Sequence, residues 1–269
     1  MDNYAVIGNP IAHSLSPRIH GLFAEQTGEE LTYRAILSHP GEFTADVEAF
    51  RQAGGRGLNV TLPFKEQAWE YAGHSSARAD RARAANLIRF DTNGRVYGDS
   101  TDGVGLVRDL GANGVQVARK HILLVGAGGA VRSVLGNLLD EQPAGVTVIN
   151  RTRSRALALL ELFPEAGGIL SAQGFDEPAA GPYDLVINGA SAGLAGQSLP
   201  LPDGILAPGA CCYDMVYGKA AQPFLDWAAS NRAAKRCDGL GMLVEQAAES
   251  FHIWRGVRPE TKPVIDALR

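Results

Sequence analysis

Apolar runs of strand length alternate along most of the chain with segments in which apolar residues recur every three or four positions. The clearest case lies mid-chain, where the apolar run His121–Val125 is followed by helical spacing of apolar residues from Val131 to Leu139. A second apolar run, Val146–Ile149, comes next. Residues 126–130, all glycine or alanine, separate the first run from the helical segment. This order predicts a strand, a glycine turn, a helix and a second buried strand.

The same pattern predicts elements on both sides of this unit. Strands are expected at residues 4–7, 31–36, 57–61, 84–90, 96–98, 183–188 and 210–216, and helices at about 17–27, 42–53, 63–71, 102–110, 155–163, 224–232 and 242–254. A hairpin turn is expected at Asp91–Gly94, between two of the strands. Because strands and helices alternate throughout, we predict the fold class α/β.

A chain of 269 residues is long enough for one large or two modest domains. The glycine turn lies mid-chain, so an N-terminal domain is expected to precede the domain that contains this turn. Glycine-rich connections occur near Asp102 and Gly239. We therefore expect the last helix to return to the first domain, which would comprise residues 1–102 and 239–269. Residues 103–238 would form the second domain.

The glycine turn of the mid-chain unit is typical of a nucleotide-binding site. Such a turn lets the backbone approach a pyrophosphate, and the following helix N-terminus supplies free N–H groups and the positive end of a dipole. Gly126 and Gly128 fit the first part of the dinucleotide pattern, but Val131 occupies the position where a third small residue is usual. A tight turn without a nucleotide therefore stays an open alternative.

Three arginines follow the second strand of this unit at alternate positions, Arg151, Arg153 and Arg155. An NAD site usually has an acid near this point to bind the ribose 2′-hydroxyl, and this segment has none. Guanidinium groups and hydroxyl donors instead suit a 2′-phosphate. Because cations at a helix N-terminus oppose the helix dipole, a role as solvated charges alone is disfavoured. The loop therefore predicts NADP(H) rather than NAD(H).

Composition and charge exclude several classes of protein. A net charge of −4 and a pI near 5.9 argue against nucleic acid as the main partner. The start of the chain has no basic segment and no long apolar run, so neither a signal peptide nor a membrane span is expected. Cys211, Cys212 and Cys237 lack metal-ligand spacing, and the histidines are scattered, so no metal site is expected. Free thiols of this kind favour a cytoplasmic location.

Several polar residues stand at predicted helix starts. Ser16 before Pro17 fits an N-cap, and its hydroxyl and that of Ser14 would also suit a carboxylate ligand. Lys65 falls in the first turn of a helix, a poor place for a cation unless it faces a cleft beside a carboxylate. Asp102 fits either a helix cap or such a carboxylate. Capping or solvation alone is an open alternative for each.

Short motifs in a fixed order give the chain a likeness to a known family. They are SLSP (14–17), NVTLPFK (59–65), DSTDG (99–103), GAGGA (126–130), NRT (150–152), YDMVY (213–217) and DGLGMLVEQ (238–246). On these motifs the chain resembles the shikimate dehydrogenase family nearly from end to end. The ordered set is far more specific than any single motif.

The resemblance implies the reversible reduction of the 3-dehydroshikimate ketone to shikimate with NADPH, a step of chorismate and aromatic amino acid biosynthesis. It also implies an α/β substrate domain (1–102 and 239–269), to which the C-terminal helix returns, beside a Rossmann-like NADP domain (103–238). Lys65 and Asp102 match the family's catalytic pair. The positions matching its substrate contacts are Ser14, Ser16, Asn59, Thr61, Lys65, Asn86, Asp102, Tyr217 and Gln246. Cofactor contacts are expected at Gly126, Ala127, Gly128, Gly129, Ala130, Asn150, Arg151, Thr152, Arg155, Ser191, Met215 and Gly239.

The residue types suit that chemistry. The cofactor supplies the hydride, so the protein has to orient two reactants and move one proton. The ketone oxygen gains alkoxide character, which the Lys65 ammonium can stabilise and protonate. Asp102 beside it would keep the ammonium charged and direct it. Neutral side chains such as Asn86 and Thr61 match the carboxylate and hydroxyls of the substrate.

Some positions depart from the usual family pattern, and other functions stay open. The departures are Ala77, Leu87, Ser100, Ala190 and Gly218. A quinate or quinate/shikimate dehydrogenase of the same superfamily is the second hypothesis, and a nucleotide-binding paralogue without catalysis is the third. The arginine loop and the paired serines favour the shikimate enzyme, and the retained Lys65 and Asp102 argue against the third hypothesis. As partners we expect a small-molecule substrate, no nucleic acid and no membrane, with the chain a monomer or homodimer.

Overall fold

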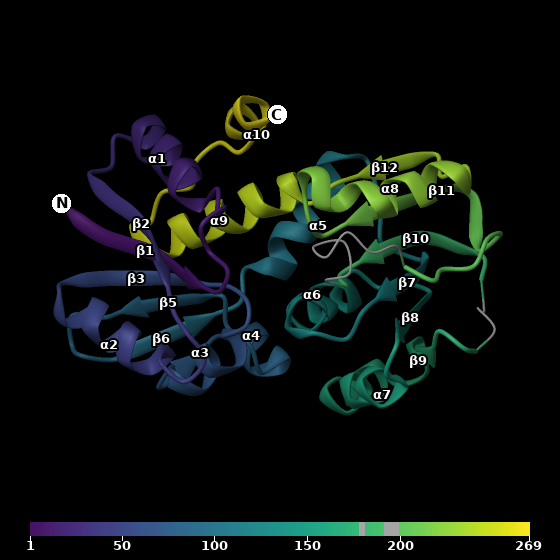
Figure 1. The fold of residues 1–269 in the computed structure, drawn as a ribbon, viewed down its shortest axis with the longest axis horizontal. Coiled ribbons are helices and arrows are strands. Elements are labelled where there is room, and N and C mark those ends of the chain that lie inside the picture. The colour runs from purple at the N-terminus through teal and green to yellow at the C-terminus, as the bar shows by residue number, and fades with distance from the viewer. Residues whose placement is uncertain (178–180, 191–198) are drawn as a thin grey trace. The chain divides into compact units, whose positions relative to one another are not determined.

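The computed structural model describes residues 1–177, 181–190 and 199–269 (Figure 1). The chain divides into two compact units. Unit 1 comprises Met1–Gly105 and Leu243–Arg269, and unit 2 comprises Leu106–Met242. Helices α5 (Asp102–Ala112) and α9 (Leu240–Arg255) each contribute residues to both units. Among the described residues, no helix has the length and apolar character needed to cross a membrane.

Unit 1 is built on a mixed sheet of six strands in the order β2-β1-β3-β5-β6-β4. Its strands are β1 (Asp2–Gly8), β2 (Leu31–Leu37), β3 (Gly55–Val60), β4 (His74–Ser75), β5 (Leu87–Phe90) and β6 (Val96–Asp99). The first three strands run parallel, and β5 is antiparallel to both β3 and β6. The expected hairpin turn at Asp91–Gly94 is confirmed, with Asp91 N donating to Arg95 O at 2.9 Å.

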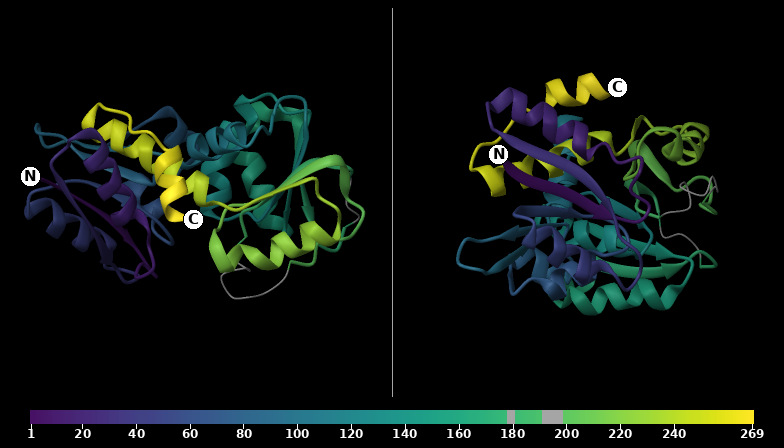
Figure 2. Two further views of the ribbon diagram at one scale, coloured as in Figure 1. Left: turned by 90° about the horizontal axis from the view of Figure 1, so that it is seen from above. Right: turned by 60° about the vertical axis from the view of Figure 1, so that its left-hand side comes forward.

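Helices pack against the sheet of unit 1, and their buried side chains form two separate hydrophobic cores. The helices are α1 (Ser16–Thr27), α2 (Phe43–Gln52), α3 (Lys65–Tyr71), α4 (Ala77–Ala82), α10 (Lys262–Leu268) and most of α9. Phe43 of α2 and the residue before α3, Phe64, pack against the apolar side chains of β1, β3 and β5. Phe23 of α1, Phe251 of α9 and Val264 of α10 share the second core. Figure 2 shows α10 beside α1, so the end of the chain completes the core of the N-terminal unit.

Unit 2 contains six parallel strands in the order β12-β11-β10-β7-β8-β9. They are β7 (His121–Val125), β8 (Gly145–Asn150), β9 (Leu170–Gly174), β10 (Tyr183–Asn188), β11 (Leu206–Asp214) and β12 (Lys235–Cys237). Numbered from β7, this is the 3-2-1-4-5-6 order of the Rossmann fold. The expected α/β class with a Rossmann-like domain is therefore confirmed.

Helices of unit 2 cover both faces of its sheet, which explains the continuous apolar runs seen in the sequence. They are α6 (Gly129–Asp140), α7 (Arg153–Leu162), α8 (Gln222–Ser230) and the short 3-10 turns η1 (Pro164–Ile169) and η3 (Gly218–Ala221). Residues of α5, α6 and α7 share one core with alternate positions of β7, β8 and β10. Residues of α8 pack with the intervening positions of these strands.

The structure differs from the expectation mainly at element ends and in short elements. Strand β11 begins earlier than expected and ends at Asp214, because Val216 N turns back to bond Asp214 Oδ1 at 2.9 Å. The sequence pattern missed β4, α4, β9, β12 and α10. Each is seven residues or shorter, which is too short to display a clear hydrophobic period.

Candidate active site

Lys65 and Asp102 form a nearly buried ion pair in unit 1. Lys65 Nζ lies 2.6 Å from Asp102 Oδ2, and the two side chains are 12% and 9% exposed. Lys65 is the first residue of α3, and Asp102 is the first residue of α5. At this distance the ammonium donates a charge-assisted hydrogen bond, which is stronger than a bond between neutral groups. The fold therefore brings together the two residues that the motifs singled out.

The helix that carries Lys65 begins later than expected. We expected it to start at Pro63, but α3 begins at Lys65 itself. The reason is a turn in which Phe64 N donates to Thr61 O at 3.1 Å, which holds the preceding residues out of the helix. Lys65 O then accepts a hydrogen bond from Ala85 N at 2.9 Å. This bond ties the start of α3 to the segment that carries Asn86.

Asn86 is the centre of a buried hydrogen-bond network. Its Nδ2 lies 2.9 Å from Asp102 Oδ1 and 3.1 Å from Gln246 Oε1, and its Oδ1 accepts a hydrogen bond from Thr101 N at 2.7 Å. We expected Asn86 within a strand, but it precedes β5. Its backbone N–H donates to Asp99 O at 2.9 Å, which fixes the residue beside β6. Both carboxylate oxygens of Asp102 therefore have a hydrogen-bond donor, Lys65 at Oδ2 and Asn86 at Oδ1.

Asn59 extends this network along β3. Its Oδ1 accepts a hydrogen bond from the Tyr33 hydroxyl at 2.7 Å, and its Nδ2 donates to Ser250 Oγ at 2.9 Å and to Asn86 O at 3.2 Å. Both of its N–H groups therefore have protein partners. In the structure its side chain holds its neighbours in place, and the substrate contact expected of Asn59 stays a prediction.

Ser14 and Ser16 lie at the start of α1, though not as expected. Ser16 is the first residue of the helix rather than its N-cap, which is Leu15. Ser14 Oγ accepts a hydrogen bond from Ser16 N at 3.3 Å, which closes a turn just before the helix. Ser16 is 5% exposed. Burial raises the pKa of Tyr33 well above its usual range, and the nearby Ser16 hydroxyl partly opposes that rise.

Thr61 follows β3, and a glycine makes room for it. Its backbone N–H donates to Ile7 O at 3.0 Å. A Cβ added at Gly8 would lie 2.3 Å from Thr61 Cγ2, so a larger residue at position 8 would displace the threonine. The remaining expected substrate contact, Tyr217, belongs to unit 2. The network itself unites Lys65, Asp102, Asn86, Asn59 and Gln246.

Sequence patterns missed four further residues around the network. Thr101 was considered only as a helix cap, and Tyr33, Ser250 and His20 were not considered. His20 is 1% exposed, and its ring stacks on that of Tyr33 with centroids 4.1 Å apart. Ser250 lies one helical turn after Gln246, so the spacing of four residues on α9 was the available signal.

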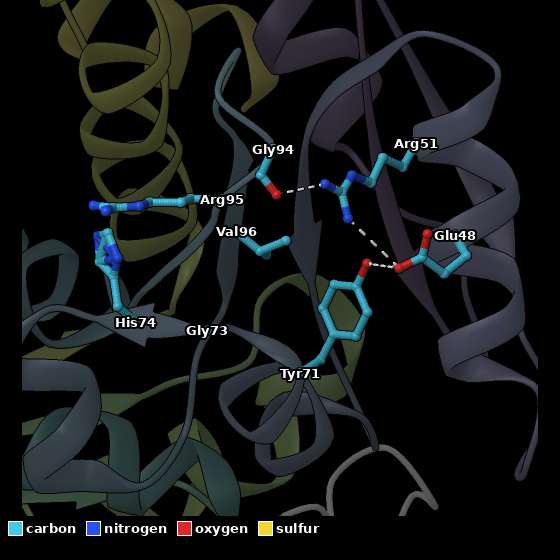
Figure 3. A pocket seen from close by; sticks show the side chains of 8 residues that line it. All are labelled: Glu48, Arg51, Tyr71, Gly73, His74, Gly94, Arg95 and Val96. Carbon is cyan, nitrogen blue, oxygen red and sulfur yellow. Dashed lines mark hydrogen bonds and ion pairs between the residues drawn. The ribbon is translucent and has the colours of Figure 1, made fainter.

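A surface pocket of about 490 Å³ also lies in unit 1, away from this network (Figure 3). It is lined by Glu48, Arg51, Tyr71, Gly73, His74, Gly94, Arg95 and Val96. Tyr71 donates to Glu48, and Arg51 donates to Gly94 O at 2.6 Å (Figure 3). None of the expected site residues lines the pocket, and three of its polar side chains bond to groups of its own wall.

In unit 2, the glycine turn after β7 lies where the order of the strands reverses. Gly126 has φ +104°, a conformation that favours glycine. A Cβ added at Gly126 would lie 3.1 Å from Ala190 N, in the segment after β10. A Cβ at Gly128 or Gly129 would meet nothing within 4 Å. Gly126 is therefore required by the fold, and the open space at the other two leaves room for a ligand at the N-terminus of α6.

Val131 in the third position of the glycine pattern also has a structural explanation. It is fully buried, and a Cβ added at Gly189 would lie 2.5 Å from Val131 Cγ2. A third small residue normally permits close packing of helix and strand. In this chain the glycine stands at the end of β10 rather than in α6. The small residue at position 189 therefore allows α6 to pack close to the sheet, although position 131 is a valine.

The three arginines after β8 differ in whether they form an ion pair within the protein. Arg153 Nε lies 2.7 Å from Glu177 Oε1. Arg151 and Arg155 are exposed, and no acidic side chain within the described ranges forms an ion pair with either of them. Asn150 Nδ2 donates to Thr152 O at 2.9 Å and closes the turn. Two guanidinium groups therefore stay available for an external anion.

Two buried polar residues that the sequence patterns missed organise the ends of β10 and β11. Asn188 Nδ2 donates to Asp214 Oδ2 at 2.9 Å, and Asn188 Oδ1 accepts from Ala190 N at 3.0 Å. Burial raises the pKa of Asp214 to about 6, although bonds from Val216 N and Asn188 oppose the rise. Next to this residue, a Cβ added at Gly239 would lie 2.3 Å from Met215 O. Met215 and Gly239 are therefore packed together, and Ser191 lies outside the described residues.

The fold and the two sets of residues define a class of protein. A Rossmann sheet with its glycine turn at the switch point accompanies a second α/β unit that carries a lysine–carboxylate pair among buried amides. These are the features of a two-unit, dinucleotide-dependent dehydrogenase. Among the described residues, no group of three or more histidine, cysteine or acidic side chains could hold a metal ion.

Comparison with known proteins identifies the family. Models described as the shikimate dehydrogenase substrate binding domain, shikimate / quinate 5-dehydrogenase and the shikimate 5′-dehydrogenase C-terminal domain match residues 6–88, 109–192 and 239–269. A shikimate dehydrogenase (NADP(+)) of Alkalilimnicola ehrlichii is 57% identical, over 100% of this chain and 98% of that protein. The chain belongs to the shikimate dehydrogenase family.

Solved structures agree with this assignment. An Ael1 enzyme from Pseudomonas putida is 43% identical, with a TM-score of 0.92 and coverage of 100% of this chain and 98% of that one. A shikimate 5-dehydrogenase from Thermus thermophilus, in complex with NADP(H) and shikimate, is 33% identical with a TM-score of 0.87. The match covers 99% of this chain and 98% of the Thermus thermophilus protein.

Proposed function

We propose that this chain is an NADP-dependent shikimate dehydrogenase, which reversibly reduces 3-dehydroshikimate to shikimate in the synthesis of chorismate and aromatic amino acids. The observation that carries the proposal is the Lys65–Asp102 pair, with Nζ to Oδ2 at 2.6 Å inside a network of neutral amides. Such a pair supplies a positioned proton donor. Membership of the family, with relatives named as NADP-dependent shikimate dehydrogenases, supports the choice of reaction.

In the reductive direction, NADPH supplies a hydride to the carbonyl carbon of the substrate. The Lys65 ammonium hydrogen-bonds to the carbonyl oxygen, stabilises the negative charge that develops there and delivers the proton. Asp102 holds the ammonium in place through Oδ2, while Asn86 keeps the carboxylate from rotating through Oδ1. In the oxidative direction, Lys65 in its neutral form accepts the hydroxyl proton. The protein thus contributes orientation and one proton transfer.

The neutral polar residues of unit 1 are proposed to bind the rest of the substrate. The hydroxyls of Ser14 and Ser16 at the start of α1 are suited to the carboxylate. Tyr217 of unit 2 remains a proposed substrate contact. Thr61, Asn86 and Gln246 supply partners for the ring hydroxyls, and Asn59 supports them. On this proposal unit 1 is the substrate-binding part of the chain, and residues 1–102 and 239–269 remain our boundaries for that domain.

Unit 2 is proposed to bind NADP(H). The pyrophosphate would lie at the N-terminus of α6, against Gly126, Ala127, Gly128, Gly129 and Ala130, where added Cβ atoms at two glycines find open space. The exposed Arg151 and Arg155, with Asn150 and Thr152, would bind the 2′-phosphate. Met215, Gly239 and Ser191 remain our proposed contacts to the rest of the cofactor. Residues 103–238 remain our boundaries for this domain.

The test is a spectrophotometric assay of NADPH oxidation with 3-dehydroshikimate, accompanied by shikimate and quinate oxidation with NADP⁺ and NAD⁺. Rapid turnover with 3-dehydroshikimate and shikimate, and a preference for the phosphorylated cofactor, is expected. Turnover with quinate alone would identify a quinate dehydrogenase. NADPH binding without turnover of either acid would identify a nucleotide-binding paralogue.

Location and assembly are proposed separately. We propose a cytoplasmic enzyme, supported by three free cysteines, of which Cys211 and Cys212 are buried. The chain is proposed to act as a monomer or homodimer. Cell fractionation tests the first proposal, and light scattering of the purified protein tests the second; a secreted protein or a larger assembly would contradict them.

A further inference from the structure

Thr101 is a fully buried polar residue next to Asp102, and its side chain contacts three other residues of the network. Its side chain has no exposed surface. The polar contacts of its side chain reach Asn86, Gln246 and Ser250, which lie on two separate parts of the chain. All four residues belong to unit 1. The arrangement points to a task other than filling space.

Thr101 fixes which end of the Asn86 carboxamide faces Asp102. Thr101 N donates to Asn86 Oδ1 at 2.7 Å, so the oxygen must lie on that side. Thr101 Oγ1 lies 2.9 Å from Asn86 Nδ2 and 3.2 Å from Asn86 Oδ1. The nitrogen is thereby directed to Asp102 Oδ1, at 2.9 Å. A carboxamide flipped by 180° would place two oxygens against each other at Asp102.

The same hydroxyl links Asn86 to helix α9. Thr101 Oγ1 lies 3.4 Å from Gln246 Oε1 and 3.2 Å from Ser250 Oγ. Gln246 in turn is oriented by its own Nε2, which donates to Leu243 O at 2.7 Å. One hydroxyl therefore contacts both amides that we assign to the substrate hydroxyls, Asn86 and Gln246.

We propose that Thr101 is a positioning residue for substrate binding: its hydroxyl aligns the carboxamides of Asn86 and Gln246 toward the ring hydroxyls of a polyhydroxylated acid. The proposal rests on the proposed function for the identity of that acid. Thr101 touches neither substrate nor cofactor in this scheme and acts through Asn86 and Gln246. Without the hydroxyl, the backbone N–H of Thr101 still holds Asn86 Oδ1, but Asn86 Nδ2 and Gln246 Oε1 lose a common partner.

Thr101→Val tests the proposal, because valine keeps the shape of threonine and removes the hydroxyl. We expect the KM for shikimate to rise about tenfold, the value of one lost hydrogen bond, with the KM for NADP⁺ unchanged within about twofold. Thr101→Ser should restore the KM for shikimate to within about twofold of wild type. A residue that only supports folding would instead lower the active fraction, reducing kcat with both KM values unchanged.

Thr147→Val is the matched control. Thr147 is also nearly buried, and its hydroxyl also accepts a side-chain hydrogen bond, from Ser171 Oγ at 3.2 Å, but it lies in β8 of unit 2. We expect this variant to keep the KM for shikimate of the wild type. An equal rise in both valine variants would overturn the proposal.

A second measurement decides the question in the absence of substrate. The side-chain amide of Asn86 gives a ¹H–¹⁵N pair in the NMR spectrum, assigned by its loss in Asn86→Ala. We expect this pair to shift or broaden in Thr101→Val and to stay in place in Thr147→Val. An unmoved Asn86 amide in folded Thr101→Val would overturn the positioning role. If the wild type did not turn over shikimate, the proposed function would fail, while the amide measurement would still decide the role of Thr101.

Discussion

Lys65 and Asn86 hold the two oxygens of one carboxylate: Lys65 Nζ lies 2.6 Å from Asp102 Oδ2, and Asn86 Nδ2 lies 2.9 Å from Asp102 Oδ1. A carboxylate bonded at only one oxygen could rotate and carry the ammonium with it. Because both oxygens are bonded, the position of the ammonium is fixed before substrate arrives. Such preorganisation favours the transition state, since no reorganisation is needed during the reaction.

Removing the ammonium should abolish most of the activity. We expect Lys65→Ala to lower kcat by about 10²–10⁴-fold, the size of a general acid–base contribution. Lys120→Ala is the control, because Lys120 also pairs with an aspartate, at 3.1 Å from Asp184 Oδ1, but in unit 2 and with a side chain that is 43% exposed. Steady-state kinetics at saturating NADPH measure both. An unchanged kcat in Lys65→Ala would remove Lys65 from the mechanism.

The arginines after β8 should bind the 2′-phosphate of the cofactor. We expect Arg151→Ala to weaken NADPH binding by about tenfold or more while leaving NADH binding nearly unchanged, because only NADPH carries the dianion. Arg153→Ala should have a smaller effect, since the Arg153 guanidinium already contacts Glu177 at 2.7 Å. Fluorescence titration with both cofactors gives the comparison. Equal losses for NADPH and NADH in Arg151→Ala would show that the loop does not recognise the phosphate.

Substitution of Gly126 and of Gly128, in the same turn, should change the free energy of unfolding by different amounts. Gly126→Ala should lower the free energy of unfolding by roughly 1–3 kcal/mol, because its φ of +104° and its neighbour Ala190 disfavour a side chain. Gly128→Ala should leave stability unchanged, because Gly128 has φ −90° and open space around it. It should still weaken NADPH binding if the pyrophosphate lies there. Denaturant titration and NADPH binding measure the pair; comparable destabilisation by both would contradict the geometry.

Acid should destabilise the protein through His20. Burial lowers the pKa of His20 from 6.5 to about 3, partly opposed by Asn59. Between pH 6.5 and about 3, His20 is therefore protonated in the unfolded chain but neutral in the folded chain. The free energy of unfolding therefore falls as the pH is lowered through this range. At pH 4.5 this difference is roughly 3 kcal/mol.

His20→Phe provides the control for this pH dependence. Phenylalanine keeps the stacking on Tyr33, and among the described residues neither ring nitrogen of His20 has a hydrogen-bond partner. We expect the variant to lose less free energy of unfolding than the wild type between pH 6.5 and 4.5. Asp214, whose raised pKa acts in the opposite direction, is present in both proteins and cancels in the comparison. Parallel curves for the two proteins would show that His20 is not the group responsible.

Much of the fold could be predicted from the sequence because unit 2 repeats one simple pattern. Its central strands are buried on both faces, so β7, β8 and β10 appear as continuous apolar runs with clear ends. Unit 1 was harder, since its edge strand β4 has two residues and its antiparallel strands have four each. Short segments carry too few positions to show a period.

The active-site network could be predicted only in part. Lys65, Asn86 and Asp102 stand in recognisable motifs, and the structure brings them together. Tyr33 and Ser250 contribute through contacts with residues far away in sequence, which spacing along the chain does not reveal. The departure at Val131 in α6 could not be explained from the sequence either, since its counterpart Gly189 directly follows β10, far away in sequence.

The two chain segments that make up unit 1 are separated in sequence by the whole of unit 2, so the ribosome synthesises them at different times. Unit 2 is uninterrupted, so its sheet can be completed while synthesis continues. Unit 1 has to wait for α9 and α10, since Phe251 of α9 and Val264 of α10 fill the core beside Phe23, and Ser250 of α9 bonds to Asn59. A nascent or prematurely terminated polypeptide that stops before these residues therefore has an unfinished N-terminal unit, whatever the state of the middle one.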